Sequence, residues 1–526
     1  MPLSRRAFLE LSGAAACAPA WTRLYPNTAG ADTAALCRKL ASDPVHPQYH
    51  LLPARNWMND PNGPIFFRGR YHMFHQYNPH GAVWGNMNWA HASSLDMIHW
   101  QHEPIALSPT PGGPDRDGVF SGSAVLDNGK PTMIYTAVAP PSTAADATLR
   151  DGSHTWRETQ CLAVAQDEDL RTWKKLSEPV IAAPPPGLEV TGFRDPCLWR
   201  EGNDWMLALG SGFPDKGGAI LIYSSPDLRH WTYLHPLLEG SSANHQAINP
   251  VDTGKMWECP DFFPLRGQNG EDKHVLLIST MGKVRWKVGT YVDRRFTPEK
   301  EDVVDWGAYY AAKTMLDANG NRNLWGWITE TRPDADLIAA GWAGAMSLPR
   351  TLSLNSENEL QTSVAPVAEQ LRSTHTSITA EATPSAQQKI LDPLRIHDLA
   401  AELQLTFRPK GDEFSIHLQS ESGENFATLS YRNKSGGREL RVNAVPAPLP
   451  GVAGSPVHLR VFLDGSVLEL FANATTSLTA RIYKIPSGPL RLKIEGEAEL
   501  TNLDVWQMTP ISKDRLTGSF CRGTNS

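Results

Sequence analysis

Short apolar and aromatic runs alternate with turn-forming residues along most of the chain. Between residues 48 and 355 the runs have the length of β-strands, and Gly, Pro, Asn and Asp separate them. The 3.6-residue spacing of an amphipathic helix is almost absent from this region. The pattern therefore predicts an all-β domain over residues 48–355.

A recurring phrase in this region indicates how its strands are grouped. Its core is Asp, then Leu or Met, two further residues and Trp, with copies at 94–100, 167–173 and 225–231. A weaker fourth copy at 292–296 has Phe in place of Trp. Repeats of this kind are typical of β-propeller blades, whose innermost strands converge on one axial funnel.

A second domain of alternating apolar runs is predicted to begin at residue 389. Turn residues at 410–412 and 422–424 predict hairpins between these runs, and Asp464-Gly465 predicts another. Such spacing predicts a β-sandwich over residues 389–510, followed by a C-terminal tail at 511–526.

The segment between the two domains has a different composition. Residues 364–371 have the clearest helical spacing in the chain, and residues 373–388 are rich in Ser, Thr and Ala. We therefore interpret residues 356–388 as a linker with a short helix.

Composition narrows the class of ligand. The chain has 526 residues, which favours two domains, and a net charge of −7 without a long basic run. Nucleic acid and anionic membranes are therefore poor candidates for partners. Trp (17) outnumbers Phe (16) and Tyr (12), and Trp is well suited to stacking on the apolar faces of sugars.

Residues 1–20 have the pattern of a twin-arginine export signal, which predicts a periplasmic or extracellular protein. Arg5-Arg6 precedes a short Ala-rich run that ends at Pro19-Ala20, and residues 21–47 form a lead-in to the propeller. The run is too short to span a bilayer, so no stable membrane span is expected. Lipid attachment at Cys17 remains an alternative.

No cofactor or metal is predicted. The cysteines (Cys17, Cys37, Cys161, Cys197, Cys259 and Cys521) are scattered, so neither a disulfide framework nor a cysteine metal site is expected. No zinc or calcium motif is present.

Three acidic residues stand in turn-like contexts. Asp60 lies in Trp-Met-Asn-Asp-Pro-Asn-Gly at 57–63, which predicts a tight turn that holds the carboxylate rigidly. Asp195 lies in Phe-Arg-Asp-Pro at 193–196, and Glu258 lies in Trp-Glu-Cys-Pro at 257–260. Glycoside hydrolysis requires two carboxyl groups. Taken singly, each motif is more typical of a structural turn.

The three motifs, in this order, resemble those of glycoside hydrolase family 32, the β-fructofuranosidase family. The resemblance extends to the second domain, for example Val-Phe-Leu-Asp-Gly-Ser at 461–466 and Thr-Ala-Arg-Ile-Tyr at 479–483. It implies a five-bladed β-propeller followed by a C-terminal β-sandwich.

The resemblance also implies roles for individual residues. Asp60 would be the nucleophile, Glu258 the acid/base and Asp195 the transition-state stabiliser. A retaining mechanism would place the carboxyl groups of Asp60 and Glu258 about 5–5.5 Å apart. The implied substrate-binding residues are Trp57, Asn59, Gln76, Trp84, Phe120, Ser121 and Arg194.

The expected activity is retaining, exo-acting hydrolysis of terminal β-D-fructofuranosyl units from sucrose or fructans. Two alternatives remain open, a fructosyltransferase of the same family and a non-catalytic fructan-binding propeller. Intact Trp57 and Asn62 favour the hydrolase over the transferase. The preferred substrate and linkage, and the oligomeric state, stay open.

Overall fold

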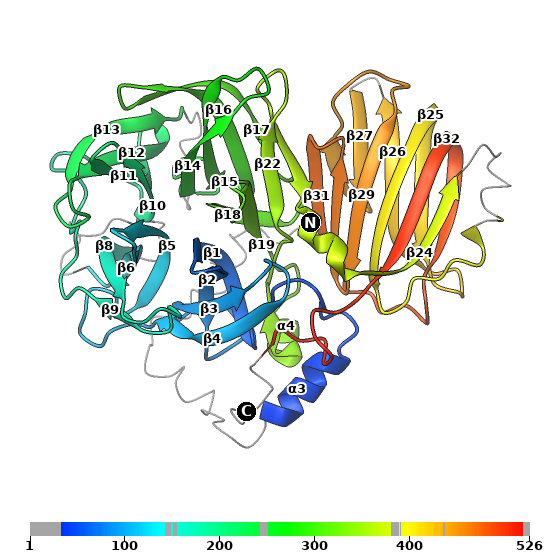
Figure 1. Ribbon diagram of the computed structural model, residues 1–526, viewed down its shortest axis with the longest axis horizontal. Coiled ribbons are helices and arrows are strands. Elements are labelled where there is room, and N and C mark those ends of the chain that lie inside the picture. Colours follow the sequence, from blue (N-terminus) through cyan, green and yellow to red (C-terminus); the bar gives the residue numbers. More distant parts are fainter. Residues whose placement is uncertain are drawn as a thin grey trace.

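The structure is a computed structural model that describes residues 33–141, 149–150, 155–241, 251–379, 389, 391–434 and 437–518. It is nearly all-β, and the predicted five-bladed propeller with a C-terminal sandwich is confirmed (Figure 1). The predicted export signal and Cys17 lie outside the described residues. In the described part of the chain, no helix is long and apolar enough to cross a membrane.

Each propeller blade is a mainly antiparallel sheet whose first strand faces the axis. The first strands β1, β5, β10, β14 and β18 contact one another in a closed ring. Blade I contains β1 (Asn56–Phe67), β2 (Arg70–Asn78), β3 (Asn88–Ser94) and β4 (Trp100–Leu107), and β20 (Trp342–Ala343) pairs in parallel with β1. Blade II contains β5 (Gly118–Asp127), β6 (Lys130–Ala139), β7 (Leu149–Arg150), β8 (Thr155–Ala165) and β9 (Trp173–Lys175).

The remaining blades follow in chain order. Blade III contains β10 (Phe193–Glu201), β11 (Asp204–Phe213), β12 (Gly217–Ser225) and β13 (Thr232–Glu239), and blade IV contains β14 (Glu258–Arg266), β15 (Asp272–Thr280), β16 (Lys283–Val292) and β17 (Arg295–Val303). Blade V contains β18 (Tyr309–Leu316), β19 (Arg322–Ile328), β21 (Ala345–Met346), β22 (Arg350–Leu354) and β23 (Leu360–Val364). Its last strand extends past the expected domain end at residue 355.

The repeated phrase forms the turn between the outer strands of a blade. Its apolar residue is left-handed in each full copy, with φ of 69° at Met97, 58° at Leu170 and 63° at Leu228. An aspartate caps the turn by accepting backbone N–H groups, as Asp227 does from Arg229 and His230. In the second copy Asp167 has this role instead of the Asp169 of the sequence pattern.

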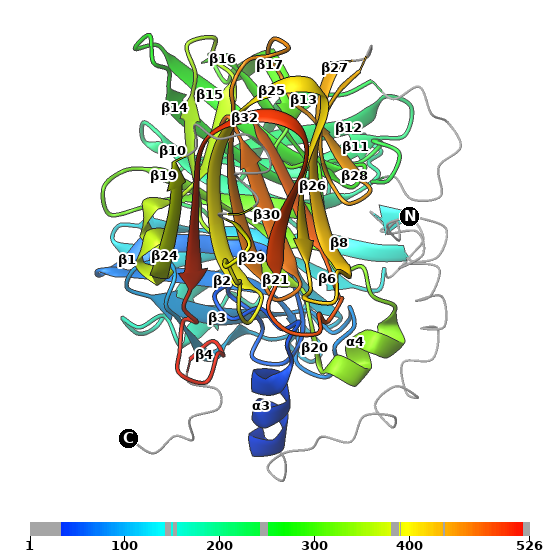
Figure 2. The same cartoon turned by 90° about the vertical axis from the view of Figure 1, so that its right-hand side faces the viewer.

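The sandwich is built around two long bent strands, β25 (Ala400–Gln419) and β32 (Arg491–Met508). Residues 400–407 of β25 pair with β29 in one layer, and residues 413–419 pair with β26 in the other. Figure 2 shows both long strands arching between the layers. The other strands of the sandwich are β24 (Arg372–Thr379), β26 (Asn425–Lys434), β27 (Gly437–Val442), β28 (Val445–Pro448), β29 (Val457–Asp464), β30 (Val467–Ala472) and β31 (Thr476–Arg481).

One of the predicted hairpins is therefore wrong. Residues 410–412 form a bend inside β25, because the runs on either side pair with β32 and not with each other. The hairpins at 422–424 and at Asp464-Gly465 are present, the latter with Gly465 at φ 53°. Leu405 and Ile416, from the two halves of β25, meet in the core between the layers.

The linker and the lead-in contain more structure than expected. Residues 372–379, predicted as linker, form β24, which pairs with β32. The predicted short helix is a 3₁₀ helix, η3 (Pro366–Leu371), and the lead-in contains α3 (Thr33–Ser42). A further helix, α4 (Asp334–Ala340), precedes β20. Cys37 in α3 forms a disulfide bond that the sequence did not predict.

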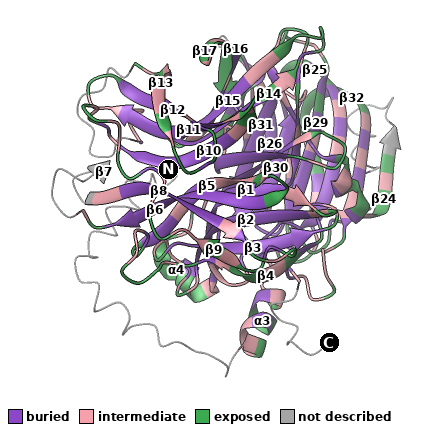
Figure 3. Ribbon diagram, turned by 60° about the vertical axis from the view of Figure 1, so that its left-hand side comes forward, coloured by how far each residue is buried: buried purple, intermediate pink, exposed green. Residues whose placement is uncertain are grey.

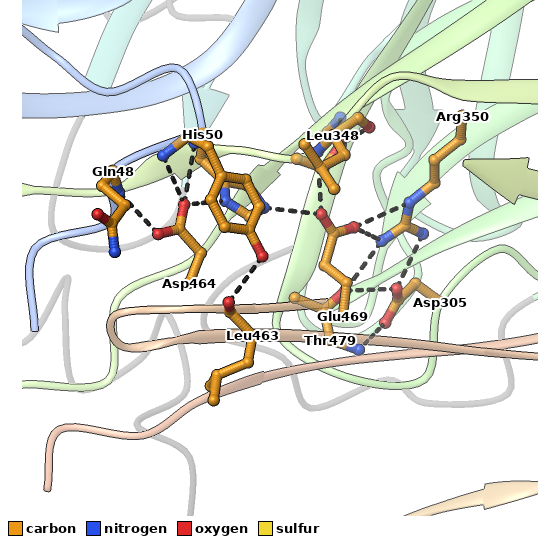
Figure 4. Close-up of polar contacts among 12 residues, drawn as sticks. Gln48, His50, Asp305, Leu348, Arg350, Leu463, Asp464, Glu469 and Thr479 are labelled. Carbon is orange, nitrogen blue, oxygen red and sulfur yellow. Dashed lines mark hydrogen bonds and ion pairs between the residues drawn. The ribbon is translucent and has the colours of Figure 1, made fainter. Parts of the chain in front are cut away.

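A fully buried ionic network joins the propeller to the sandwich (Figure 4). Asp464 accepts backbone N–H groups from residues 48, 49 and 50 and lies 2.7 Å from His50 Nδ1. The other ring nitrogen of His50 lies 2.9 Å from Glu469 Oε1, and Glu469 Oε2 lies 2.5 Å from Arg350 Nη2. Arg350 continues to Asp305 at 2.9 Å.

The pKa values show that this network is charged. Burial lowers the pKa of His50, but hydrogen bonds to Asp464 and Glu469 outweigh burial and raise it to about 9. Burial raises the pKa of Glu469, but Arg350 and His50 outweigh it and lower it to about 2. The contribution of His50 to stability is therefore complete below its unfolded pKa of 6.5 and is lost as the pH rises through about 9.

We predict that His50→Gln destabilises the protein by about 3–5 kcal/mol at pH 6, because buried carboxylates lose their cation. The difference from the parent should shrink as the pH approaches 10. Thermal unfolding at both pH values measures the difference. His375→Gln is the matched control, since the His375–Asp504 pair is partly exposed and should contribute little. A gap that is the same at both pH values would contradict this assignment.

Candidate active site

Each first strand of the described propeller contains an extra residue at the same level of the funnel, and β1 contains a second one between Asn62 and Ile65. From Met58 to Pro61 the chain advances by three residues on β1 but by only two on its partner β2. The same register shift follows Val119, Arg194, Glu258 and Tyr310 on the other first strands. These β-bulges turn side chains that would otherwise alternate across the sheet towards the axis. Figure 3 shows β1 and β10 buried over most of their length.

The bulges explain the unusual local sequence. Asp195 and Cys259 have φ of 65° and 48°, a conformation that is uncommon for non-glycine residues and unusual within a strand. Pro61, Pro196 and Pro260 are tolerated because they lie at the bulges, where the regular ladder of hydrogen bonds is interrupted. The predicted tight turn around Asp60 is thus wrong: the whole motif lies within strand β1.

Asp60 is buried and held from three sides. Its Oδ1 accepts a hydrogen bond of 3.0 Å from Asn59 Nδ2, whose own Oδ1 accepts one of 2.8 Å from Trp57 Nε1. Its Oδ2 accepts a hydrogen bond of 2.7 Å from Ser121 Oγ and lies 3.4 Å from Cys259 Sγ. Trp57, Asn59 and Ser121 therefore orient this carboxylate.

Glu258 is held by an arginine and a tyrosine. Its Oε1 accepts hydrogen bonds from Arg194 Nη2 at 2.8 Å and Nε at 3.1 Å, and its Oε2 accepts one from Tyr310 at 2.9 Å. Arg194 also binds Glu158 at 3.0 Å. Burial lowers the pKa of Arg194, but Glu158 and Glu258 outweigh burial and hold it above its usual range, so the guanidinium is charged.

Asp195 shares the sulfur of Cys259 with Asp60. Its Oδ2 accepts a hydrogen bond of 2.9 Å from the backbone N–H of Cys259 and lies 3.4 Å from Sγ. Burial raises the pKa of Asp195 to about 7, and the charges of Glu258 and Asp60 add to this against the opposing effect of Arg194. Burial also raises the pKa of Cys259, which keeps a neutral thiol between the two carboxylates.

Three half-buried aromatic side chains form a wall beside these acids. Trp156 lies 5.3 Å from Phe120 and 5.8 Å from Trp84, measured between ring centroids. Gln76 is buried, and its Nε2 donates to the carbonyl of Val119. Every residue in the predicted site thus lies on β1, β2, β5, β10 or β14, or in the loop that carries Trp84.

A second layer of buried side chains lies immediately below the bulges. Cys197 Sγ lies 3.3 Å from Asp261 Oδ1, and Lys313 Nζ donates to the carbonyl of Pro260 at 2.6 Å. These contacts join the first strands of blades III, IV and V beneath the carboxylates. Among the described residues, no group of three His, Cys, Asp or Glu side chains is arranged to hold a metal ion.

Comparison with known proteins identifies the family. The sequence matches Glycosyl hydrolases family 32 N-terminal domain over residues 50–364 and Glycosyl hydrolases family 32 C terminal over residues 352–507. The chain belongs to glycoside hydrolase family 32. This family 32 chain is accordingly a glycoside hydrolase.

Relatives and solved structures agree with this assignment. The sucrose-6-phosphate hydrolase of Escherichia coli is 34% identical over 84% of this chain and 90% of that protein. The acid beta-fructofuranosidase of Vigna radiata is 32% identical over 88% of this chain and 79% of that protein. The crystal structure of fructan 1-exohydrolase IIa from Cichorium intybus superposes with a TM-score of 0.74 at 25% identity, covering 89% of this chain and 98% of that one.

Three residues of this family 32 site were missed by sequence reasoning. Tyr310 stands in an Ala-Tyr-Tyr-Ala run without a charged residue, whereas Trp156 and Glu158 lie in an unremarkable stretch of β8. Their spacing of two residues, which places them on one face of a strand, was the available signal.

We predict that Asp195→Asn stabilises the family 32 chain at pH 8 by roughly 1–4 kcal/mol. The folded state holds the Asp195 proton more tightly than the unfolded state, so the cost of the charge grows from pH 4 to 7. Asparagine tolerates the positive φ and keeps an acceptor for Cys259 N–H. Thermal unfolding should show the difference at pH 8 and its disappearance near pH 4.

Asp464→Asn is the matched control for this prediction. The same change in the interdomain network removes the anion beside His50, so it should destabilise the protein at pH 6. Asp195→Asn that is less stable than the parent at pH 8 would contradict the prediction.

Proposed function

We propose that this chain is a retaining, exo-acting β-fructosidase that hydrolyses terminal β-D-fructofuranosyl units from sucrose or fructans through a covalent fructosyl-enzyme. The observation that carries the proposal is the convergence of Asp60, Asp195 and Glu258 on one axis, each from the bulge of a different blade. The names of the Vigna and Cichorium relatives, a beta-fructofuranosidase and a fructan exohydrolase, support the sugar.

Asp60 is the proposed nucleophile because its donors orient it without ion-pairing it. It attacks the anomeric carbon of the fructosyl unit while Glu258 gives a proton to the leaving glycosidic oxygen. Glu258 then takes a proton from the water that cleaves the fructosyl–Asp60 ester, which regenerates both carboxyl groups. The proposed separation of the two groups is about 5–5.5 Å.

Asp195 and Arg194 are the proposed fructose-binding pair. Their buried polar atoms are set beside Asp60 and Glu258, where hydrogen bonds to sugar hydroxyls strengthen as the ring flattens. Cys197, Asp261 and Lys313 are buried where the first strands of blades III, IV and V meet, and packing of this kind beneath the acids supports removal of a terminal unit rather than cleavage within a chain.

Water is the proposed acceptor of the fructosyl group. Trp57 is intact, as in the hydrolase form of the motif, and it connects through Asn59 to Asp60 by hydrogen bonds. The fructosyltransferase remains the second candidate. A purely fructan-binding propeller is disfavoured, because burying three carboxylates together costs stability that binding alone does not require.

The proposed location is periplasmic or extracellular. The twin-arginine pattern at residues 5–6 supports export, and the disulfide bond at Cys37 is the kind of bond that persists in oxidising compartments. A phosphorylated sucrose, as in the name of the Escherichia coli relative, is a substrate to compare directly.

We predict that Glu258→Gln keeps substrate binding but lowers kcat by about 10²–10⁴-fold, because proton transfer to the leaving group is lost. The assay follows product release from sucrose, 1-kestose, inulin, levan and sucrose-6-phosphate. Fructose alone supports exo-hydrolysis, longer oligomers from sucrose support transfer, and no product from any substrate supports the binding protein. Parent-like rates in Glu258→Gln would remove this residue from the role.

We predict that Tyr310→Phe shifts the alkaline limb of the pH–rate profile to higher pH. The ionised form of Glu258 loses a hydrogen-bond donor, so the protonated acid persists to higher pH. Profiles of kcat from pH 4 to 9 measure the shift. Tyr309→Phe is a neighbouring control, because the ring of Tyr309 packs against the guanidinium of Arg350 in the interdomain network. A shift of the alkaline limb to lower pH would contradict the assignment.

A further inference from the structure

Glu158 is a fully buried carboxylate that the mechanism above does not use. It lies on β8, the third strand of blade II counted from the axis, and not on a first strand. Its Oε2 accepts a hydrogen bond of 2.6 Å from the backbone N–H of Phe193, and its Oε1 accepts one of 3.0 Å from Arg194 Nη1. One carboxylate thus binds both the backbone and the side chain of the residues just before Asp195.

Two neutral side chains of blade II hold the same segment. Gln160 Nε2 donates to the carbonyl of Phe193 at 2.8 Å, and Gln160 Oε1 accepts from Thr136 Oγ1 at 2.8 Å. Thr136 Oγ1 in turn accepts the backbone N–H of Asp195 at 2.9 Å. Blade II therefore fixes the left-handed Asp195 by backbone contacts, and among these three residues only Glu158 also supplies charge.

That charge acts on Arg194. The guanidinium is shared between Glu158 on one side and Oε1 of Glu258 on the other. Without Glu158, its full positive charge would act on Glu258 and the neighbouring acids. The charged and titratable groups around it are Asp60 on β1, Asp195 on β10, Glu258 and Cys259 on β14, and Tyr310 and Lys313 on β18.

We propose that Glu158 is a positioning residue that fixes Arg194 and, by neutralising part of its charge, keeps a proton available to the carboxyl cluster at working pH. Glu158, Glu258 and Asp195 surround Arg194, and Asp60 acts on Asp195 in turn, so the cluster of acids retains a proton. Removal of one negative charge favours ionisation of the others, and the acid needed for leaving-group protonation is then lost at lower pH. The inference rests on the proposed fructosidase function.

The test compares the isosteric variants Glu158→Gln and Thr136→Val with the parent on whichever substrate the parent hydrolyses. For Glu158→Gln we expect both limbs of the kcat profile to move to lower pH by about one unit. We expect kcat at the optimum to fall about tenfold with a smaller change in KM. Thr136→Val removes the acceptor of Asp195 N–H without changing charge, so kcat should fall while the limbs stay in place.

Glu158→Asp is the rescue variant. It keeps the charge on a shorter side chain, so we expect the parent limbs with a reduced kcat, and it decides the question if Glu158→Gln does not fold. Limbs that stay in place in Glu158→Gln, or that move equally in Glu158→Asp, reject the proposal while leaving the fructosidase intact. A parent without activity on any substrate rejects the fructosidase and this inference with it.

Discussion

The candidate active site depends on an extra residue that each first strand of the propeller contains at one level of the funnel. A regular strand alternates its side chains between two faces, so it can present only every second residue to the axis. The bulges after Met58, Val119, Arg194, Glu258 and Tyr310 break this alternation at one level. As a result Arg194 reaches Glu258 while the adjacent Asp195 reaches Cys259, although the two residues are consecutive. The ring of five first strands then brings these side chains within hydrogen-bonding distance across blades.

This arrangement strains the backbone at two residues and raises the pKa of a buried carboxyl group. Asp195 and Cys259 occupy left-handed conformations, and Asp195 has a pKa raised to about 7 because it is buried beside other acids. Neighbouring blades hold these strained residues through backbone hydrogen bonds, including the one from Asp195 N–H to Thr136.

The three acids could be predicted from the sequence, but their geometry could not. The Asp-Pro and Cys-Pro pairs pointed to Asp60, Asp195 and Glu258, yet a proline after a polar residue has the same local signature in a turn and in a bulged edge strand. The bend in β25 was missed for a similar reason, since Lys-Gly-Asp at 410–412 suits a hairpin and a bend equally. Glu158 and Trp156 could not be selected from the sequence, because their partners Arg194 and Trp84 lie far away along the chain and meet β8 only in the fold. The five-bladed count came from family resemblance, because only the repeated turns were visible locally.

The two buried ionic networks of this chain differ in how their charges are paired, which accounts for a structural role in one and the proposed chemistry in the other. In the interdomain network the cations His50 and Arg350 alternate with Asp464, Glu469 and Asp305, so each carboxylate has a cation beside it. The pKa of Glu469 falls to about 2 there, because Arg350 and His50 outweigh the effect of burial. In the funnel one guanidinium serves several acids, and the pKa of Asp195 rises to about 7 in equal burial. The difference is how many carboxylates share each cation and not the depth of burial. Arg194 is shared by Glu158 and Glu258, whereas Lys313 donates to the carbonyl of Pro260. A carboxyl cluster whose members outnumber their paired cations retains a proton, which is what the proposed acid chemistry requires.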